Sequence, residues 1–442
     1  MAMNSRARIT HLAGLSLVEL LVAIALGGIL LGGAISLFVN NRATYEITND
    51  MARLQENARF ALQLLGNDIR MGGHVGCVND VTKINDNIEL AEGRLANFSH
   101  AFEGFESGAA SWSPSGHVGE DGAVVATDSG AIILGNPAQT PGDPAPAVPG
   151  YAAFFPNSDG ITVRYFLGDR STALLADTDA GLDSFGNAMT AVNNEVVNKS
   201  PNDANDLVPV LQVRALTHTL VDGQVVAVAD CGAADLFELN GVPATVSVNG
   251  TTEKTLAATT VDTVTALKGP NTALKRSYEL ANRAVIMPFV GVRYFVRLNA
   301  ANIPALYRTA LISGGLTETT AELVDGVQSM QILYGIDSDQ DGSPNAFLSA
   351  GQTGVADPLD ATKTINLTTR NDYLAVVAVK ISLLLGTIDE FGGTQDDNVY
   401  DVGNERFCRA GLVAAPVCTR TYPADFRRRR VFQTTIAVRN FQ

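Results

Sequence analysis

The sequence is poor in cysteine, and none of its four cysteines forms a C-x-x-C pair. Zinc ribbons and thioredoxin-like redox sites are therefore excluded, because both need that close spacing. An even number of cysteines in an exported chain predicts two disulfides, with three alternative pairings. The short separation favours Cys408–Cys418, which leaves Cys77–Cys231 as a long-range bridge. Four buried thiols in a cytosolic protein are the alternative.

Motifs of common enzyme classes are also missing. The chain has no G-x-x-x-x-G-K-[ST] phosphate loop, no G-x-S-x-G nucleophile turn and no H-E-x-x-H zinc helix. The histidines are scattered, with no pair at helical metal-ligand spacing: His11, His74, His100, His117 and His218. We therefore expect a protein that is not an enzyme and that requires no cofactor.

Positive charge is scarce in this chain. Its 31 lysines and arginines face 46 acidic residues, which gives a formal net charge of −15. An acidic body repels nucleic acid and anionic lipid headgroups, so we expect no nucleic-acid partner. The length of 442 residues suggests two or three folding units.

One long apolar run lies near the N-terminus. Residues 1–14 are polar and contain Arg6 and Arg8, whereas residues 15–39 contain a single charged side chain, Glu19. As a helix these 25 residues would be about 37 Å long, enough to cross a hydrocarbon core of ~30 Å. The arginines before the run place the N-terminus in the cytoplasm and the following residues outside.

Two features of this run are unusual for a secretory signal. The small residue that could mark a cleavage site, Gly14, precedes the apolar run, so cleavage there would leave the helix on the mature protein. Glu19 also places a carboxylate inside a membrane segment, which is costly unless it is paired. Cleavage after Gly14 would expose the amine of Leu15, which could pair with Glu19 of a neighbouring subunit.

Residues 14–23, GLSLVELLVA, resemble the prepilin peptidase signature of type IV pilins and type II secretion pseudopilins. The resemblance implies cleavage between Gly14 and Leu15, N-methylation of Leu15, and a role for Glu19 in recruitment into a filament. Leu15 departs from the phenylalanine that is usual at the first mature position. A plain single-pass anchor is the alternative.

The helix should continue beyond the membrane. Between Arg42 and Met71 the only glycine is Gly66, and there is no proline. Apolar residues spaced by threes and fours form one stripe: Ile47, Met51, Leu54, Ala58, Leu62, Leu65 and Ile69. Gly72 and Gly73 predict the end of the helix. We therefore expect a helix over residues 15–73, with residues 15–39 in the membrane.

Further segments resemble the PilW group of minor pilins: residues 55–62, 68–77, 231–237 and 428–440. This resemblance implies a minor pilin that works with other minor pilins and the major pilin, with a tip adhesin as a further candidate partner, after processing by the prepilin peptidase. It would sit in the inner membrane with a periplasmic head, and later at or near the pilus tip. A minor pseudopilin of a type II secretion system, or a surface adhesin, are the alternatives.

The remaining chain predicts strands. Residues 93–150 are rich in small residues and proline, with an extended loop over 137–149. Strand-like runs cover residues 160–167, 208–216, 224–229, 285–298, 323–336, 374–385 and 431–438. We expect an α+β fold, in which the long helix packs on an antiparallel sheet of residues 281–442 and residues 74–280 form a β-rich insertion lobe.

Two charged motifs remain. Asp337, Asp339 and Asp341 alternate before Gly342, as in the first half of a calcium loop, although Leu348 stands where the bidentate glutamate would be. The motif predicts either a calcium site or an Asp-rich turn. Residues 427–430 are four arginines, and solvated or ion-paired structural roles are favoured over an anion site.

Overall fold

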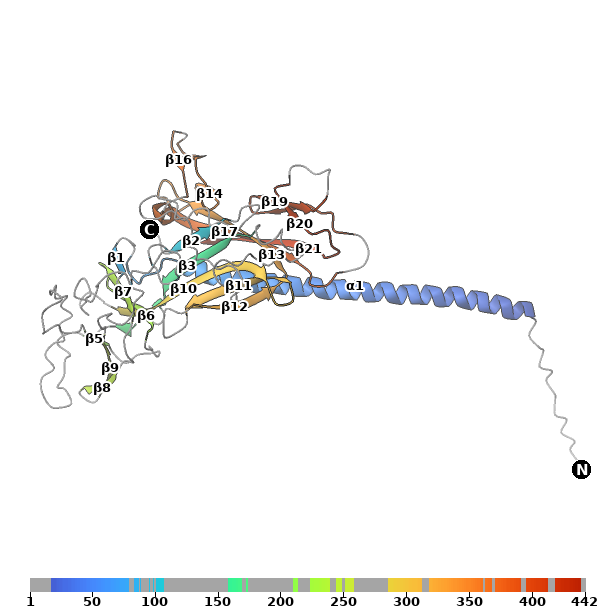
Figure 1. The fold of residues 1–442 in the computed structure, drawn as a ribbon, viewed down its shortest axis with the longest axis horizontal. Helices are drawn as coiled ribbons and strands as arrows, with labels where there is room; N and C mark the ends of the chain where they lie inside the picture. Colours follow the sequence, from blue (N-terminus) through green and yellow to red (C-terminus); the bar gives the residue numbers. More distant parts are fainter. Residues whose placement is uncertain are drawn as a thin grey trace, which may run out of the picture. The chain divides into compact units, whose positions relative to one another are not determined.

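The computed structural model has a long helix and several β-sheets (Figure 1). It describes residues 17–78, 83–86, 88, 95, 98, 101–106, 158–168, 172–173, 210–213, 223–238, 244–248, 251–257, 285–311, 318–360, 362–367, 370–390, 395–411 and 418–438. The chain divides into two units, residues 1–53 and 54–442. The predicted leader, residues 1–14, and the predicted loop over residues 137–149 lie outside the described residues.

The helix α1 covers Leu17–Met71. It ends where the sequence predicts: Gly72 and Gly73 form a turn, and Gly73 has a φ of 75°, which favours glycine. The amide of Gly73 then donates to the carbonyl of Arg164 at 2.9 Å, so the chain passes directly from the helix to the sheets.

The largest sheet has nine strands, in the order β1-β7-β6-β10-β11-β12; in addition β3 and β4 pair with β10, and β2 pairs with β3. Their bounds are β1 Ile84–Asp86, β2 Phe102–Phe105, β3 Gly160–Phe166, β4 Thr172–Ala173, β6 Val225–Ala229, β7 Ala234–Glu238, β10 Val285–Leu298, β11 Pro304–Leu311 and β12 Glu318–Asp325. The strand β10 is rich in β-branched and aromatic residues, which suits its central position. Its first residues pair with β6 and β4, and its last with β11 and β3.

A second sheet has four strands in the order β14-β13-β17-β21, with all pairs antiparallel. Their bounds are β13 Val327–Ile336, β14 Ala346–Leu348, β17 Val376–Gly386 and β21 Arg429–Ala437. Alternate residues of β17 face opposite sides: Ile381 and Leu383 belong to the main core, whereas Leu384 joins a small cluster with Phe407 and Tyr422. One face of this sheet is therefore covered by the main core, and part of the other face by the small cluster.

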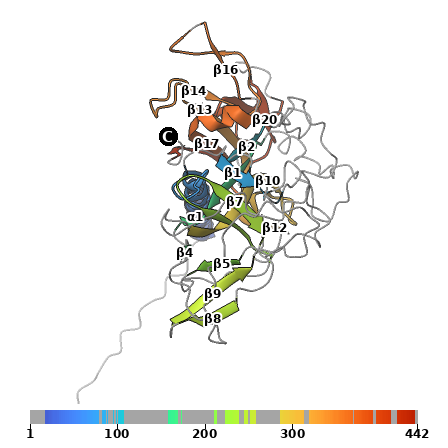
Figure 2. The same cartoon turned by 90° about the vertical axis from the view of Figure 1, so that its left-hand side faces the viewer.

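Three smaller sheets complete the fold. Their strands are β5 Val210–Val213, β8 Ala244–Val248 and β9 Thr251–Ala257, then β15 Val355–Ala356 and β16 Thr364–Ile365, and finally β18 Tyr400–Val402, β19 Glu405–Arg409 and β20 Arg420–Tyr422. Figure 2 shows β9 between β5 and β8. A 3-10 helix, η6, covers Arg370–Ala375. The pairs β1–β7 and β19–β20 are parallel, which the antiparallel expectation did not include.

The α+β fold is confirmed, with two corrections. Residues 323–336 are not one strand, because Gly326, with a φ of 80°, separates β12 from β13 and sends the chain from the nine-stranded sheet to the four-stranded one. A Cβ at this position would lie 2.7 Å from the carbonyl oxygen of Gly386, so only glycine fits. The expected boundary near residue 280 also does not separate two sheets, since β10 pairs with β3, β4 and β6.

Candidate functional site

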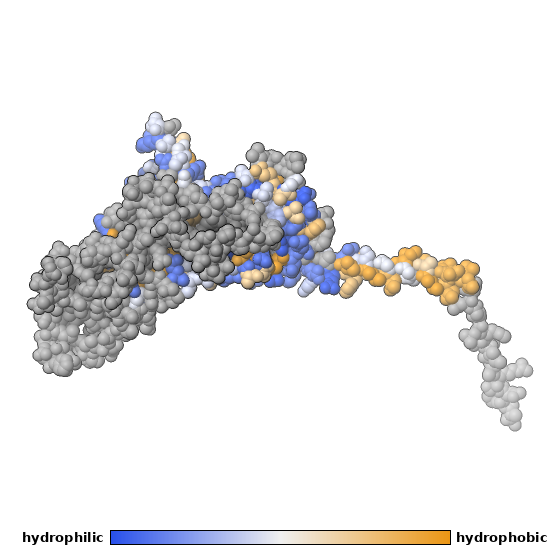
Figure 3. Space-filling model, viewed as in Figure 1, coloured by the Kyte–Doolittle hydropathy of each residue, from blue (hydrophilic) through white to orange (hydrophobic). Residues whose placement is uncertain are grey.

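The first part of α1 carries an apolar surface that no other described residue of its unit covers. Large side chains from Leu17 to Val39 are exposed, with Leu17 and Leu30 each at 74%. This end of the helix is orange in Figure 3, which marks hydrophobic residues. The helix is long and apolar enough to cross a membrane, with a mean hydropathy of 2.4 over its most apolar 18 residues. An exposed apolar surface of this size needs lipid or other helices around it, which fits a membrane-anchored protein.

Glu19 is exposed in the first turn of α1, within this apolar part. Gly14 and Leu15, the predicted cleavage and methylation positions, lie outside the described residues. The cleavage and methylation therefore stay predictions, and so does the pairing of Glu19 with the amine of a neighbouring subunit.

The last part of α1 is buried in the head, which we define as the unit of residues 54–442. The predicted stripe faces the core there: Ala58, Leu65 and Ile69 are fully buried and Leu54 is nearly so. They share one cluster with residues of both large sheets. Burying a leucine or isoleucine side chain contributes about 1.5–3 kcal/mol, so this stripe holds the helix firmly to the sheets.

A buried carboxylate adds a polar anchor to the same stripe. Asp68 Oδ1 accepts a hydrogen bond of 2.8 Å from the hydroxyl of Tyr165 in β3, and Oδ2 accepts one from the hydroxyl of Tyr294 in β10. Arg308 in β11 lies 3.5 Å from Oδ2, and its Nε also donates to the Tyr294 hydroxyl at 3.2 Å. Burial, and then the charge of Asp68, raise the pKa of Tyr294, so the hydroxyl remains a donor.

The sequence reading missed the role of Asp68. The available signal was an acidic residue placed beside Leu65 and Ile69 on an otherwise apolar helical face. Its partners could not be read from the sequence, because they lie 97 and 226 residues away. The anchor fixes the last part of α1 to three adjacent strands of the head.

Two disulfides are present, and they join the pairs that the sequence favoured. Cys77, just after α1, is bonded to Cys231 in the turn between β6 and β7, a separation of 154 residues. Cys408 and Cys418 close a small loop of ten residues. The first bridge therefore ties the end of the helix to the far strands of the nine-stranded sheet.

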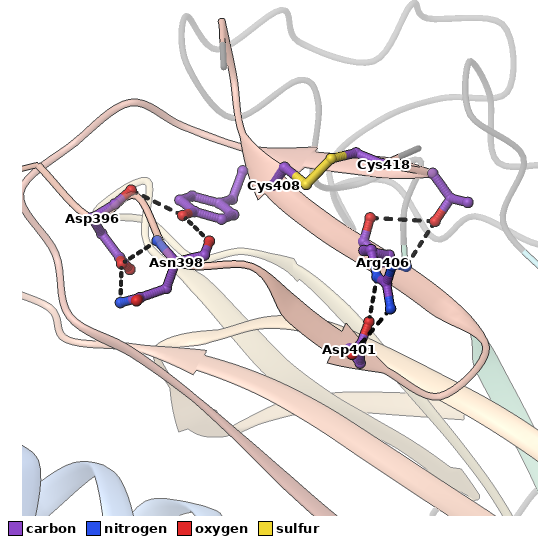
Figure 4. The surroundings of a disulfide bond; sticks show 8 residues. Asp396, Asn398, Asp401, Arg406, Cys408 and Cys418 are labelled. Carbon is purple, nitrogen blue, oxygen red and sulfur yellow. Dashed lines mark hydrogen bonds and ion pairs between the residues drawn. A yellow bond between two sulfur atoms is a disulfide. The ribbon is translucent and has the colours of Figure 1, made fainter. Parts of the chain in front are cut away.

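The second bridge lies in a polar neighbourhood (Figure 4). Close to Cys408 in the chain, Arg406 Nε donates to Asp401 Oδ1 at 2.7 Å. On the other side of the view, the amide of Asn398 donates to Asp396 Oδ1 at 3.2 Å. These contacts order the loops around β18, β19 and β20, and they involve no nucleophile with an adjacent base.

The aspartate loop brings its three carboxylates together. Ligand oxygens of Asp337, Asp339 and Asp341 lie within 4.8 Å of one another. Asp337 also accepts hydrogen bonds from the backbone amides of Gln340 at 2.7 Å and Gly342 at 2.8 Å, and its pKa is lowered. Leu348, where a calcium loop has its bidentate glutamate, is fully buried in the core. The residues fit part of a calcium site, and calcium binding stays a prediction.

The arginines of residues 427–430 act mainly within the head. Arg429 is buried and donates to both carboxylate oxygens of Asp425, at 2.7 and 2.8 Å. Arg427 lies 3.3 Å from Asp425 and 3.8 Å from Glu390. Arg430 is exposed and stacks over the ring of Phe432, 5.6 Å from its centroid. The ion-paired structural role expected for this cluster holds for Arg427 and Arg429.

A half-buried glutamate just after β2 is a second feature that the sequence did not reveal. Burial raises the pKa of Glu106 to about 7, with repulsion from Glu405 adding to the rise and Arg420 opposing it. Glu405 and Arg420 themselves form an ion pair of 3.1 Å between β19 and β20. Glu106 therefore carries a proton for part of the time near neutral pH.

A groove of about 920 Å³ runs between α1 and β21. Its residues from the helix are Gln55, Glu56, Arg59, Leu62, Gln63, Gly66 and Arg70, and those from β21 are Arg430, Phe432, Gln433, Thr434 and Ile436. Most of the β21 residues are at every second position of the strand, so their side chains lie on the same face of the sheet, toward the helix. The groove is partly apolar and contains three arginines and one glutamate.

Residues 293–440 match the family model described as type IV pilus-assembly protein W, PilW. The matched part of the head is therefore similar to PilW. The match covers the end of β10, then β11, β12 and the whole four-stranded sheet, which includes the strand side of the groove. Searches of curated proteins and of solved structures gave no significant match. The match supports a protein related to type IV pilus assembly.

Proposed function

We propose that this protein is a minor pilin, a structural subunit of the membrane complex that starts pilus assembly, and that it sits at or near the pilus tip. The observation that supports this role best is the combination of a PilW-type head with an N-terminal helix whose apolar surface is left uncovered. Such a helix can lie in the inner membrane before assembly and among the helices of other subunits afterwards.

In this proposal the prepilin peptidase removes residues 1–14 and the new N-terminal amine of Leu15 is methylated. The exposed carboxylate of Glu19 then pairs with the N-terminal amine of a neighbouring subunit. Two charges that are costly in lipid become one neutral contact, and that gain favours recruitment. The head stays outside the membrane and contacts other minor pilins, the major pilin and a tip adhesin.

The protein works by holding subunits together and not by catalysis. Among the residues that the structure describes, several buried charged groups are held in ion pairs and hydrogen bonds, such as Asp68 with Tyr294 across two elements and Arg429 with Asp425 in the turn before β21. These are contacts that stabilise a rigid head, which a subunit under mechanical load requires.

The test is the variant Glu19→Ala, with Glu46→Ala as the matched control on the same helix. Glu46 is exposed and pairs with Arg42, four residues earlier. We expect Glu19→Ala to be cleaved normally but to co-purify with other pilus subunits about tenfold less, because an ion pair in lipid is lost. Glu46→Ala should behave as the wild type. Unchanged co-purification and piliation in Glu19→Ala would contradict the pairing mechanism.

A further inference from the structure

We propose that the groove between α1 and β21 binds an acidic, extended segment of another pilus subunit, which pairs with the outer edge of β21 as a fifth strand. This inference rests on the proposed function and adds to it the binding site and the chemistry of the partner. Three properties of the groove support it: an open strand edge, an apolar floor and an excess of positive charge.

The open edge is the first property. The strand β21 lies at the end of the four-stranded sheet, and among the described residues only β17 pairs with it. In an antiparallel pair about half of the backbone amides and carbonyls point away from the partner, so β21 offers a row of groups on its other side. Nine residues of strand are about 30 Å long, enough for a full added strand. A long, unprotected edge is usually a binding site, since proteins otherwise block it with proline or bulges.

The floor of the groove supplies the second property. Leu62 and Phe432 are partly buried, and Ile436 is buried against Gly66 of the helix. The strand residues that face the groove are every second one, which is also the spacing of side chains on one face of an added strand. Alternate side chains of the partner would therefore enter the groove, and the others would face solvent. Main-chain pairing gives affinity in this mode, and the pockets give specificity.

Charge identifies the partner segment as acidic. The groove has Arg59 and Arg70 on the helix and Arg430 on the strand, against one acidic residue, Glu56. This positive surface stands out in a chain with a net charge of −15. Arginines bind carboxylates through two parallel hydrogen bonds, and complementary charge also selects among partners. A segment that alternates acidic with small or apolar residues would match both the arginines and the floor.

The head has a second open edge that serves as the comparison. The strand β12 ends the nine-stranded sheet, but its exposed residues include Glu322 and no arginine or lysine. An acidic segment would be repelled there. A contact that depends on strand pairing alone would use both edges, whereas the contact proposed here uses only β21.

The experiment is site-specific photo-cross-linking of the full-length chain in cells that assemble pili. Gln433→p-benzoylphenylalanine places the probe on β21 at the rim of the groove, beside the strand edge, and Thr320→p-benzoylphenylalanine places it on β12; both positions are exposed. Mass spectrometry then identifies the cross-linked segment. We expect Gln433 to cross-link to an acidic, extended segment of another pilus subunit, with a yield about tenfold above that from Thr320.

Charge variants make the result specific. Arg59→Glu with Arg430→Glu should lower the cross-linking yield about tenfold, whereas Arg59→Lys with Arg430→Lys should lower it much less. Equal thermal unfolding of the purified variants would show that the head is intact. The inference is overturned if Gln433 cross-links to its own chain, to a second copy, or to no protein, or if charge reversal leaves the yield unchanged.

Cross-linking and co-purification, measured in the same cells, test this inference and the proposed function separately. If Gln433 gives no cross-link but the chain still co-purifies with other pilins in a manner that depends on Glu19, the groove is wrong and the minor pilin function stands. If co-purification with pilins is also absent, both proposals fail.

Discussion

Two parts of α1 are both rich in apolar residues and differ in what surrounds them. Between Leu17 and Val39 the large side chains are exposed, whereas between Leu54 and Ile69 the apolar stripe is buried against the sheets. Composition alone does not distinguish these parts. The difference lies in arrangement, because the first part is apolar on all sides and the second on one side only. A one-sided stripe can be satisfied by the head, and an all-round apolar surface needs lipid or other subunits.

This comparison predicts two separate kinds of mutational effect. Changes in the head should alter the free energy of unfolding, and changes in the exposed part of the helix should alter membrane insertion and assembly. Each variant below tests whether the two sets of effects can be separated, beginning with the largest.

Removing the long-range disulfide should cost the most. By loop-closure entropy, Cys77→Ser with Cys231→Ser loses about 5 kcal/mol, because the bridge closes 154 residues. Cys408→Ser with Cys418→Ser, the matched control, loses about 3 kcal/mol for its ten-residue loop. Denaturant unfolding of the head measures both. A larger loss from the short loop would show that Cys77–Cys231 does not join the helix end to the sheet as a stabilising bridge.

Leu65→Ala compares the two parts of the helix directly. It should destabilise the head by about 2–5 kcal/mol, because the side chain is fully buried in the main core. Leu30→Ala, on the exposed part, should change unfolding of the head by less than about 0.5 kcal/mol. Urea unfolding monitored by circular dichroism provides the measurement. Similar losses in both variants would remove the distinction between the two parts.

Asp68→Asn tests the polar anchor. The asparagine keeps the shape but loses the charge that two tyrosine hydroxyls and Arg308 contact, so we expect a loss of about 1–3 kcal/mol. Asp401→Asn removes an exposed ion pair with Arg406 and should leave the free energy of unfolding almost unchanged, because solvent screens the pair. Equal effects at the two sites would mean that the buried network does not hold the helix to the head.

Glu106→Gln should have a pH-dependent effect. Because the pKa of Glu106 is raised to about 7, the folded head holds the proton more tightly than the unfolded chain does. The contribution of Glu106 to the free energy of unfolding is therefore largest below about pH 4.5, and it is lost as the pH rises through about 7. The free energy of unfolding of the variant, relative to that of the wild type, should therefore rise by about 1–2 kcal/mol between pH 5 and pH 8. Glu390→Gln, at an exposed position, should show no such trend, and a flat profile for Glu106→Gln would contradict the assignment.

Calcium should have the smallest effect. If the aspartate loop binds it, calcium at several times its Kd stabilises the head by about 1 kcal/mol. Asp341→Asn should remove that gain and Asp360→Asn, outside the loop, should keep it. Thermal unfolding with calcium, with magnesium and with a chelator measures the effect. An identical Tm in all three would leave the motif as an Asp-rich turn.

The local features were predictable from the sequence. The helix ends at Met71 because two glycines follow, and the predicted strand over 285–298 has the observed bounds of β10. The run over 323–336 was misread because a single glycine, Gly326, makes the turn between two strands that are both apolar. The disulfide pairing is the one that sequence separation favoured among three alternatives.

The features that depend on distant contacts were not predictable. Asp68 finds its tyrosines 97 and 226 residues away, and the groove is formed by two segments about as far apart as the chain allows. Both arise from strand order, which brings β3, β10 and β21 to the helix, and strand order is not encoded in the pattern of any one strand. Local sequence patterns therefore predict the secondary-structure elements. The surfaces between elements depend on the tertiary arrangement, which these patterns do not specify.

The most direct test of the account is the intact mass and N-terminal sequence of the protein recovered from its native membrane. The account predicts a mature chain that begins at N-methylated Leu15 and keeps the whole apolar part of α1. A chain that retains residues 1–14 would contradict it, because Glu19 would then have no neighbouring amine of Leu15 with which to pair.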